Sequence, residues 1–379
     1  MYVTEIFLQN FRNISELRLE LSDGINIFLG RNAQGKTNIL EAVYFSSVLR
    51  SRAAKVQELI QWNNSAAFVR IQFSKADVSQ EVSIELTAER NRRRLLVNGD
   101  AAKSKDFIGR LNSVMFSPED LFMLRGAPAG RRQFLDVEIS QAAPVYYSNL
   151  SSYNRIVTQR NRLLKKICEG LVRRPYLTVW NEQLAEYAAR VSLYRIIAVY
   201  RLNNLANEIY KNISAQNENF SVEYKFKNAD FDVPLEDFYS STFRKNLLMW
   251  YYQNIVERSS RDIERGNTSI GPHLDDLNFF INNRELKSYA SQGQLRTAAL
   301  ALKLSELEFL KTARGEYPLL LLDDVMSELD AERRTQLLEF LKQRKIQTII
   351  TAAEEKYFPA ENLGKMFEVN AGTVTPITI

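Results

Sequence analysis

Apolar and polar residues alternate in several short stretches of the N-terminal part of the sequence. The alternation has the two-residue period of half-buried strands and occurs at residues 17–21, 69–73 and 82–86. An Asn98–Gly99 pair follows an apolar run and is typical of a tight turn between two strands. We therefore predict an antiparallel meander over about residues 66–100.

Helical spacing of apolar residues replaces this alternation from about residue 130 and continues through Tyr210. A mixed segment runs to about Ser259, and strands alternating with helices return beyond Gly271. The elements expected there are a helix at 292–312, a strand at 319–322, a helix at 331–343 and a strand at 347–351. The pattern predicts an α/β protein in which a discontinuous domain (residues 1–130 and 260–379) carries an inserted, mainly helical lobe (residues 131–259).

Composition narrows the class of protein. Of the 379 residues, 45% are hydrophobic and 25% are charged, as in ordinary globular proteins. There is neither a run of about 18 apolar residues nor a signal-peptide pattern at the start. A single cysteine and a single histidine exclude an internal disulfide and a histidine-rich metal centre. We expect a cytoplasmic protein, and its net charge of +5 is compatible with a polyanionic partner.

The residues that follow a short buried strand at 25–29 have the pattern of a phosphate-binding loop. They match G-x-x-x-x-G-K-[ST] with Gly30, Arg31, Asn32, Ala33, Gln34, Gly35, Lys36 and Thr37. The glycines allow backbone N–H groups to surround phosphates. Lys36 is expected to reach the β- and γ-phosphates of ATP, and Thr37 is expected to bind Mg²⁺. We predict an amphipathic helix after the loop. A glycine turn that binds nothing is the alternative.

A second candidate site begins where an apolar strand ends in two acids. Residues 319–322 are four leucines, so Asp323 and Asp324 are expected at the edge of a buried sheet, where α/β proteins bind ligands. Asp323 is predicted to complete the Mg²⁺ shell. Asp324 is predicted to act with Lys36 in catalysis, by orienting or activating the attacking water. An acidic helix cap after a core strand is the alternative.

Two further motifs lie on either side of these acids. Ser291–Gln294 (Ser-Gln-Gly-Gln) begins a predicted helix, and Ser327–Asp330 (Ser-Glu-Leu-Asp) follows the acids. Ser291 as a helix N-cap is a sufficient structural explanation, although a helix N-terminus also binds phosphate and Gly293 permits close approach. In this order the motifs resemble those of ATP-binding-cassette ATPases. The resemblance implies that Ser291 and Gly293 contact the nucleotide bound by a second copy of the chain.

The spacing of the motifs narrows the resemblance further. About 250 residues separate Thr37 from Ser291, more than a transporter head usually places there, and sustained heptads for long coiled-coil arms are missing. The chain resembles the RecF family of bacterial recombination-repair proteins in the segments Asn10–Asn13, Ser117–Asp120, Arg131–Asp136, Gln159–Asn161 and Gly271–His273.

The resemblance implies a fold and a function. The fold is an ATP-binding-cassette P-loop ATPase head, which combines a mixed sheet with helices and an antiparallel meander, and which carries an inserted helical lobe. The function is that of a weak ATPase whose ATP-driven dimer clamps gapped or junction DNA. RecO- and RecR-type partners and the loading of recombinase, in repair and replication, are implied as well.

Some positions differ from the class or the family. Asp324 stands where most cassette heads have glutamate, and Thr351 stands where a switch histidine is usual. Leu274 follows His273 where the family tends to have a basic residue. A packed structural role is expected for His273 rather than a catalytic one. Pro118–Glu119 lies where cassette heads have a glutamine loop, and no metal role is predicted for it.

Two groups of cations are candidates for contact with DNA phosphates. The first, on the predicted meander, comprises Arg90, Arg92, Arg93, Arg94, Lys103 and Lys105. The second, on the predicted lobe, comprises Arg155, Arg160, Arg162, Lys165, Lys166, Arg173 and Arg174. No base-recognition motif accompanies them, so sequence-independent binding to the backbone is expected. A solvated charged face is the alternative for both groups.

Two other classes of protein also use a phosphate loop. The energising subunit of a membrane transporter would have a shorter head, and the long insertion and the basic charge argue against it. A P-loop phosphotransferase would need neither Ser291–Gln294 nor Ser327–Asp330. We therefore favour an ATP-gated, DNA-binding ATPase.

Overall fold

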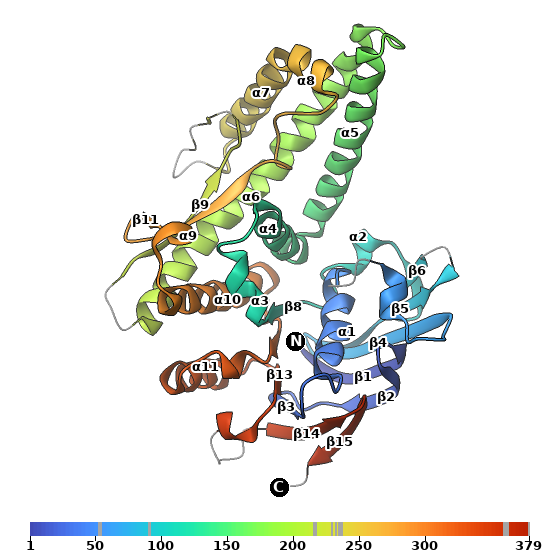
Figure 1. Ribbon diagram of the computed structural model, residues 1–379, viewed down its shortest axis with the longest axis vertical. Helices are drawn as coiled ribbons and strands as arrows, with labels where there is room; N and C mark the ends of the chain where they lie inside the picture. Colours follow the sequence, from blue (N-terminus) through green and yellow to red (C-terminus); the bar gives the residue numbers. More distant parts are fainter. Residues whose placement is uncertain are drawn as a thin grey trace. The chain divides into compact units, whose positions relative to one another are not determined.

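The chain forms two compact units, each assembled from separate parts of the sequence (Figure 1). The computed structural model describes residues 1–51, 55–89, 92–214, 218–228, 230–231, 233, 238–358 and 364–377. The first unit comprises Met1–Phe122, Glu208–Asn217 and Ser291–Ile379, and the second comprises Met123–Asn207 and Glu218–Ala290. The sequence-based boundary near residue 260 falls inside the second unit.

A mostly parallel sheet forms the centre of the first unit, with the strand order β15-β14-β3-β13-β12-β8. Its strands are β3 (Ile25–Leu29), β8 (Ser113–Phe116), β12 (Leu319–Asp323), β13 (Thr348–Ala352), β14 (Gly364–Asn370) and β15 (Thr373–Ile377). Of these strands, β15 alone pairs antiparallel to its neighbour. The four leucines of β12 are at most 1% exposed, as expected for a strand covered on both faces. The predictions of β3, β12 and β13 are confirmed.

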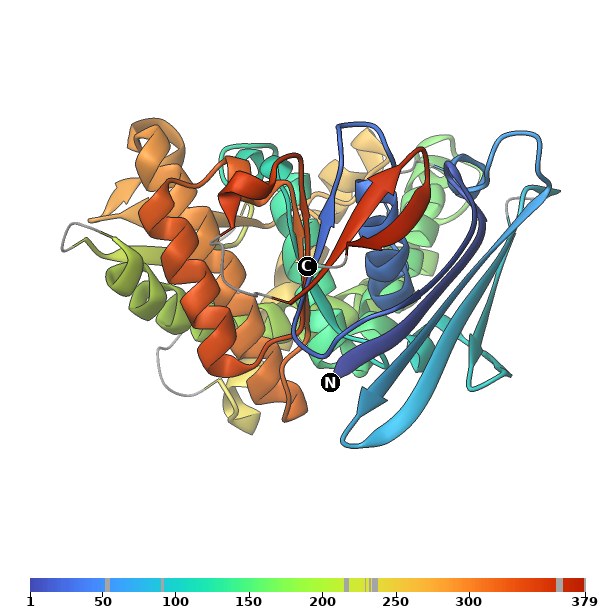
Figure 2. The same cartoon turned by 90° about the horizontal axis from the view of Figure 1, so that it is seen from below.

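The second sheet of this unit is antiparallel, with the order β2-β1-β4-β5-β6-β7. Its strands are β1 (Tyr2–Phe11), β2 (Ile14–Glu20), β4 (Ala66–Lys75), β5 (Val78–Thr87), β6 (Arg92–Val97) and β7 (Asp100–Ala102). Figure 2 shows them side by side in a curved sheet. Buried residues alternate with less buried ones along β4, because successive side chains of a strand point to opposite faces. The predicted meander is confirmed by β4 to β7.

Helix α1 (Lys36–Val48) packs against both sheets of the first unit (Figure 2). The prediction of an amphipathic helix is wrong here, because Tyr44 is the single residue from Ile39 to Val48 that is not buried. Its serines pair internally: the hydroxyl of Ser46 donates to the carbonyl of Ala42 at 2.9 Å. Polar residues on this helix therefore do not mark a solvent face.

The remaining helices of the first unit flank the sheets. They are α2 (Ser104–Phe107), α3 (Pro118–Met123, whose last residue belongs to the second unit), α10 (Gln292–Arg314) and α11 (Ala331–Arg344). The helices predicted at 292–312 and 331–343 are confirmed by α10 and α11. Among the helices that the structure describes, none combines the length and the apolarity needed to span a lipid bilayer.

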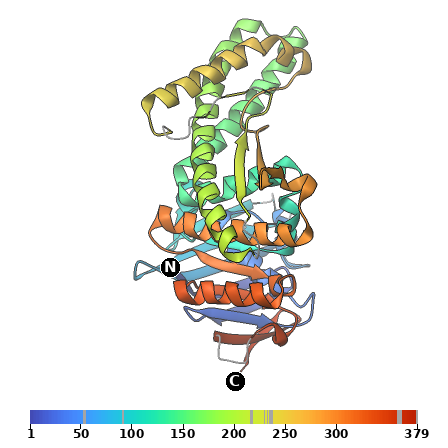
Figure 3. The same ribbon diagram turned by 90° about the vertical axis from the view of Figure 1, so that its left-hand side faces the viewer.

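The second unit is mainly helical and contains a small sheet. Its helices are α4 (Pro128–Ala142), α5 (Pro144–Cys168), most of α6 (Leu177–Ile213), α7 (Ser241–Glu257), α8 (Ser259–Arg265) and α9 (Leu286–Tyr289). The sheet has the order β11-β10-β9, from β9 (Phe220–Lys225), β10 (Asp276–Ile281) and β11 (Arg284–Glu285). Figure 3 shows α6 beside β9, where Asn203 Oδ1 accepts a hydrogen bond from the backbone N–H of Val222 at 2.8 Å. The helical pattern predicted up to Tyr210 is confirmed.

Candidate nucleotide-binding site

A cavity of about 370 Å³ lies in the first unit, where β3 and β12 end. The carboxyl ends of parallel strands are where open α/β sheets bind ligands. The lining residues are Asn13, Asn32, Ala33, Gly35, Lys36, Thr37, Asn38, Pro118, Glu119, Asp323, Asp324 and Thr351. The phosphate loop and the paired acids, which are far apart in the sequence, thus share one cavity.

Two glycines of the loop have no room for a side chain. A Cβ at Gly30 would lie 2.3 Å from the backbone oxygen of Val369 in β14. Gly35 has a φ of 108°, and a Cβ there would lie 2.8 Å from the side chain of Asn13. The loop is therefore packed between the β1–β2 turn and β14, and this tight approach needs glycine.

Lys36 is buried at the start of α1 and points its ammonium group back over the loop. Its Nζ donates to the backbone oxygens of Gly30 at 2.5 Å and of Arg31 at 2.9 Å. Burial lowers the pKa of Lys36, whereas the carboxylates of Asp324 and Asp323 act in the opposite direction. These two contacts hold the ammonium group over the loop, where a phosphate-binding lysine is needed.

Asp323, at the end of β12, is bonded to two hydroxyl groups. Thr37 Oγ1 donates to Asp323 Oδ1 at 2.8 Å, and Thr351 Oγ1 donates to the same oxygen at 3.0 Å. A hydroxyl beside a carboxylate is the oxygen-rich pair that Mg²⁺ takes together with phosphate oxygens. The structure brings together the two residues predicted to hold the metal, and their chemistry fits Mg²⁺.

Asp324 has a strained backbone and an unpartnered oxygen. Its φ of 55° lies in the left-handed region, which aspartate and asparagine tolerate better than most residues. Its Oδ1 is buried and has no hydrogen-bond partner among the described residues. Burial raises its pKa, the charge of Lys36 lowers it, and that of Asp323 raises it further. A buried, unpaired carboxylate oxygen facing a phosphate site is suited to orient water.

Two residues of this site have supporting contacts that their sequence patterns do not indicate. Thr351 stands where a switch histidine is usual, and its hydroxyl bonds Asp323 and accepts from the backbone N–H of Asp324 at 3.0 Å. Gln34 braces the loop: its Oε1 accepts from Ala371 N at 2.7 Å and its backbone oxygen accepts from Gly372 N at 2.8 Å. No pattern in the sequence indicates that the β14–β15 turn contacts the phosphate loop.

We expect Gln34→Ala to weaken ATP binding about fivefold, because one lost hydrogen bond is worth about 1 kcal/mol. The substitution removes the acceptor of Ala371 and frees the loop without touching Lys36 or Thr37. Titration with a fluorescent ATP analogue measures the effect. Gln9→Ala, at an exposed position of β1, is the control. Equal affinities of the two variants would show that the side-chain bond of Gln34 to the turn does not support the loop.

The segment Ser291–Gln294 lies at the N-terminus of α10, outside the cavity lining. Ser291 caps the helix: its hydroxyl accepts from Gln294 N at 3.2 Å, and Gln294 Oε1 accepts from Ser291 N at 2.8 Å. Ser291 and Gly293 are both exposed. The structural explanation as a helix cap is confirmed, and the exposed position also leaves this helix end accessible to another molecule.

The segment Ser327–Asp330 links β12 to α11 and to α10. The Ser327 hydroxyl donates to the backbone oxygen of Asp324 at 2.8 Å. Glu328 pairs with Arg296 of α10 at 3.0 Å. Asp330 caps α11 by accepting from Arg333 N at 2.9 Å. The paired acids and α10 are therefore connected through this segment.

The first group of predicted DNA-binding cations lies on β6 and around α2. Arg92, Arg93, Arg94, Lys103 and Lys105 are exposed, and Arg90 lies outside the described residues. Arg93 donates to the backbone oxygen of Leu49 at 3.0 Å, and Arg94 is 3.4 Å from Glu85. Some of these cations are thus engaged within the unit, while Arg92, Lys103 and Lys105 point to solvent.

The second group includes one residue that cannot contact DNA. Arg160 is 0% exposed and pairs with Asp262 at 2.7 Å, so its inclusion was wrong. In the sequence of a helix, an arginine that pairs with a buried carboxylate looks the same as an arginine that is exposed. His273 is packed as expected: its Nδ1 is 2.5 Å from the hydroxyl of Tyr153, and burial lowers its pKa to about 4.

The fold and these contacts define a class of protein. A phosphate loop between a buried strand and a helix, a strand ending in paired acids, and an antiparallel sheet over α1 are the parts of an ABC-type ATPase head. Residues 2–375 match the family model of the RecF/RecN/SMC N terminal domain. The fold alone is shared with an Smc head bound to the C-terminal winged-helix domain of ScpA, at a TM-score of 0.57 and 15% identity over 100% of this chain and 98% of that one.

Closer relatives identify the family. The chain is 38% identical over 382 residues to the DNA replication and repair protein RecF of Halothermothrix orenii, covering 99% of both chains. It is 40% identical over 377 residues to that of Streptococcus agalactiae serotype V, covering 99% of this chain and 98% of the relative. A solved structure of the recombination mediator protein RecF with ATP, in the RecFOR pathway, matches with a TM-score of 0.88 and 34% identity over 99% of both chains. The protein belongs to the RecF family. This membership does not favour the alternative that the protein is the energising subunit of a transporter.

Proposed function

We propose that this protein is an ATP-dependent DNA-binding protein of replication and recombinational repair. In this proposal, ATP joins two copies head to head, and the dimer holds gapped or junction DNA without sequence specificity. Slow hydrolysis of ATP then releases the DNA. Membership of a family of ATPases with RecF relatives named for DNA replication and repair supports it.

The division of the nucleotide-contacting motifs carries the proposal of a dimer. The cavity lining contains Lys36, Thr37 and both aspartates, but neither Ser291 nor Gly293. The N-terminus of a long helix has backbone N–H groups and a partial positive charge that favour phosphate. Because the N-terminus of α10 is exposed and lies outside the cavity lining of its own copy, the phosphate that it binds belongs to ATP held by a second copy. Each ATP then lies between the loop of one copy and the α10 N-terminus of the other.

The cavity residues have distinct roles in this proposal. The loop backbone and Lys36 bind the triphosphate, and Thr37 and Asp323 would hold Mg²⁺, whose charge would offset that developing on the phosphates. Asp324 orients the attacking water through its unpartnered carboxylate oxygen. Thr351 keeps both aspartates in place by its hydrogen bonds. With a single short carboxylate to position water, hydrolysis is slow.

DNA and protein partners complete the proposal. The exposed cations Arg92, Lys103 and Lys105, with Arg93 and Arg94, contact DNA phosphates from the meander. Contacts of this kind position a protein on DNA without recognising bases. RecO- and RecR-type mediators are the proposed protein partners, because solved relatives are described within the RecFOR pathway.

Sedimentation of the purified protein, with and without ATP–Mg²⁺ and with a fluorescent gapped duplex, tests the proposal. We expect a monomer without nucleotide and a dimer that carries the DNA when ATP is present. A protein that stays monomeric and leaves the duplex free in ATP would contradict both the dimer and the DNA-binding function.

Asp324→Asn should bind ATP and dimerise, yet hydrolyse ATP on the order of 10²-fold more slowly, because the carboxylate that orients water is lost. Asparagine tolerates the left-handed backbone at this position, so the fold is preserved. Phosphate release under saturating ATP measures the rate. Asp106→Asn, at an exposed position of α2, is the control and should hydrolyse at the original rate. An unchanged rate for Asp324→Asn would remove this residue from the catalytic step.

A further inference from the structure

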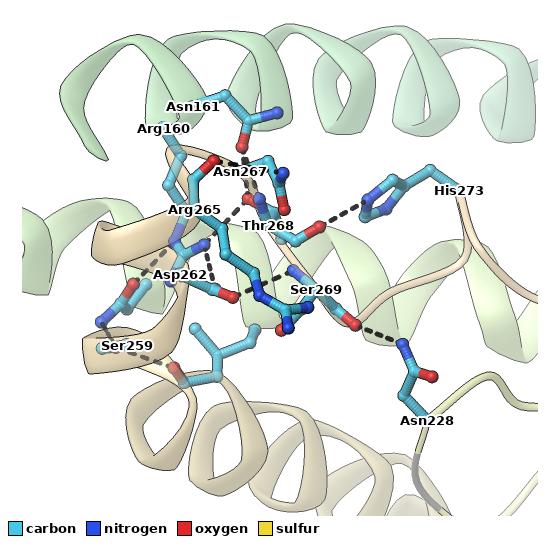
Figure 4. A network of polar contacts seen from close by, with 12 residues as sticks. Arg160, Asn161, Asn228, Ser259, Asp262, Arg265, Asn267, Thr268, Ser269 and His273 are labelled. Carbon is cyan, nitrogen blue, oxygen red and sulfur yellow. Dashed lines mark hydrogen bonds and ion pairs between the residues drawn. The ribbon is translucent and has the colours of Figure 1, made fainter. Parts of the chain in front are cut away.

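A buried network joins the C-terminal half of α5 to α8 in the second unit (Figure 4). Arg160 of α5 donates to the carboxylate of Asp262 in α8 at 2.7 Å and to the hydroxyl of Thr268 at 2.8 Å. The neighbouring Asn161 accepts from the backbone N–H of Thr268 at 2.8 Å. Separating these groups would leave a buried charge without its partner, which is costly. The network therefore holds α5 and α8 in one arrangement.

This arrangement gathers exposed cations from three segments into one surface. We define the tip cluster as Arg162, Lys165 and Lys166 of α5, Arg173 and Arg174 of the α5–α6 connection, and Arg261 of α8. Lys165 lies against the end of α8, since a Cβ at Gly266 would be 2.9 Å from its Cγ. Arg174 donates to the hydroxyl of Ser260 in α8 at 2.9 Å. Figure 1 shows α8 beside the same end of α5.

The charge of the tip cluster is not balanced locally. Residues 155–174 and 258–265 contain ten lysines or arginines and three aspartates or glutamates. This excess is larger than the net charge of +5 of the whole chain. Within the described residues, no ion pair joins a tip-cluster side chain to a carboxylate. A fixed set of unpaired like charges creates a positive potential that attracts a polyanion.

We propose that the tip cluster binds the phosphate backbone of duplex DNA. This inference rests on the proposed function, which it extends to a surface on the second unit. Arg162, Lys165 and Lys166 have the spacing that places side chains on one helix face, and duplex DNA offers a charge about every 1.7 Å along its axis. Several phosphates can therefore be neutralised at once.

The composition of the surface favours duplex DNA over a single strand. A single-strand site needs aromatic side chains on which successive bases stack. Tyr176 is the one aromatic residue within 155–176, and residues 258–265 contain none. Binding through arginine and lysine to phosphates also carries no sequence preference.

The test compares charge-neutralised variants of the full-length protein in ATP–Mg²⁺. The tip variant carries Arg162→Gln, Lys165→Gln and Lys166→Gln. The matched control carries Lys225→Gln, Lys245→Gln and Arg284→Gln, at exposed positions of the same unit. A charge-preserving variant carries Arg162→Lys, Lys165→Arg and Lys166→Arg. Fluorescence anisotropy measures the affinity for a blunt duplex and for a single strand over a range of salt concentrations, and sedimentation with ATP checks that each variant is intact.

We expect the tip variant to lose at least about tenfold in duplex affinity and about three units in the slope of log K against log salt. The control and the charge-preserving variants should bind as the unmodified protein does. Equal duplex affinity of the tip and control variants would overturn the proposal while leaving the proposed function standing. A loss confined to single strands would overturn the choice of duplex. Failure of the unmodified protein to bind any DNA in ATP would overturn the proposed function as well.

Discussion

Lys36→Ala is expected to abolish ATP-dependent dimerisation. Among the described residues, Lys36 is the single cation in the cavity lining, which also contains Glu119, Asp323 and Asp324. Without it a triphosphate would face these carboxylates with no positive side chain to offset them. Because ATP joins the two copies in the proposed mechanism, a protein that cannot hold ATP should sediment as a monomer at any nucleotide concentration tested.

The control for this experiment is Lys365→Ala, which removes an exposed lysine from β14 of the same unit. It should dimerise in ATP as the unmodified protein does. Circular dichroism of both variants separates loss of the fold from loss of nucleotide. If Lys36→Ala dimerises normally in ATP, the phosphate loop does not take part in joining the copies and the composite site is wrong.

Ser291→Arg should leave ATP binding to the monomer intact and prevent the dimer from forming. Ser291 lies outside the cavity lining, so the bound nucleotide of the same copy is not disturbed. A long cationic side chain at the exposed start of α10 would fill the space into which the partner's γ-phosphate must come. Equilibrium binding of a fluorescent ATP analogue and sedimentation in ATP report the two properties separately.

Ser291→Ala is the matched control, because arginine at this position also removes the helix cap. Loss of the cap costs about 1 kcal/mol of helix stability in either variant. Ser291→Ala adds no bulk and should still dimerise, with a moderately weakened interface. A result in which Ser291→Arg forms the dimer as readily as Ser291→Ala would assign the segment a capping role only.

Much of the fold and of the site follows from local sequence. Alternation in the meander, the four leucines of β12 and the helical spacing in α5 and α6 each reflect a period that a strand or helix imposes on its buried face. The phosphate loop is equally local, since Gly30 to Thr37 supply their own turns, backbone donors and lysine. Thr37 and Asp323 were both predicted to bind Mg²⁺, and they meet because the carboxyl ends of parallel strands lie at one edge of the sheet.

Other features depend on contacts between distant segments. The prediction of an amphipathic α1 was wrong because both sheets of the unit pack against the helix. The sequence around the helix does not specify these contacts with distant segments. The roles of Gln34 and Thr351 arise from hydrogen bonds to Ala371 and to the two aspartates. Neither residue belongs to a sequence pattern that indicates these bonds, so their supporting roles follow only from the positions of their partners.

Arg160 and Arg162 show where the limit lies. That this stretch of α5 is helical and rich in cations follows from the sequence, because helical spacing and charge are properties of neighbouring residues. The burial of Arg160 against Asp262 and the exposure of Arg162 are instead set by the packing of α5 against α8. The partner of a buried charge is supplied by another segment. The position of that partner in space, rather than the local pattern, determines which cation is buried and which is exposed.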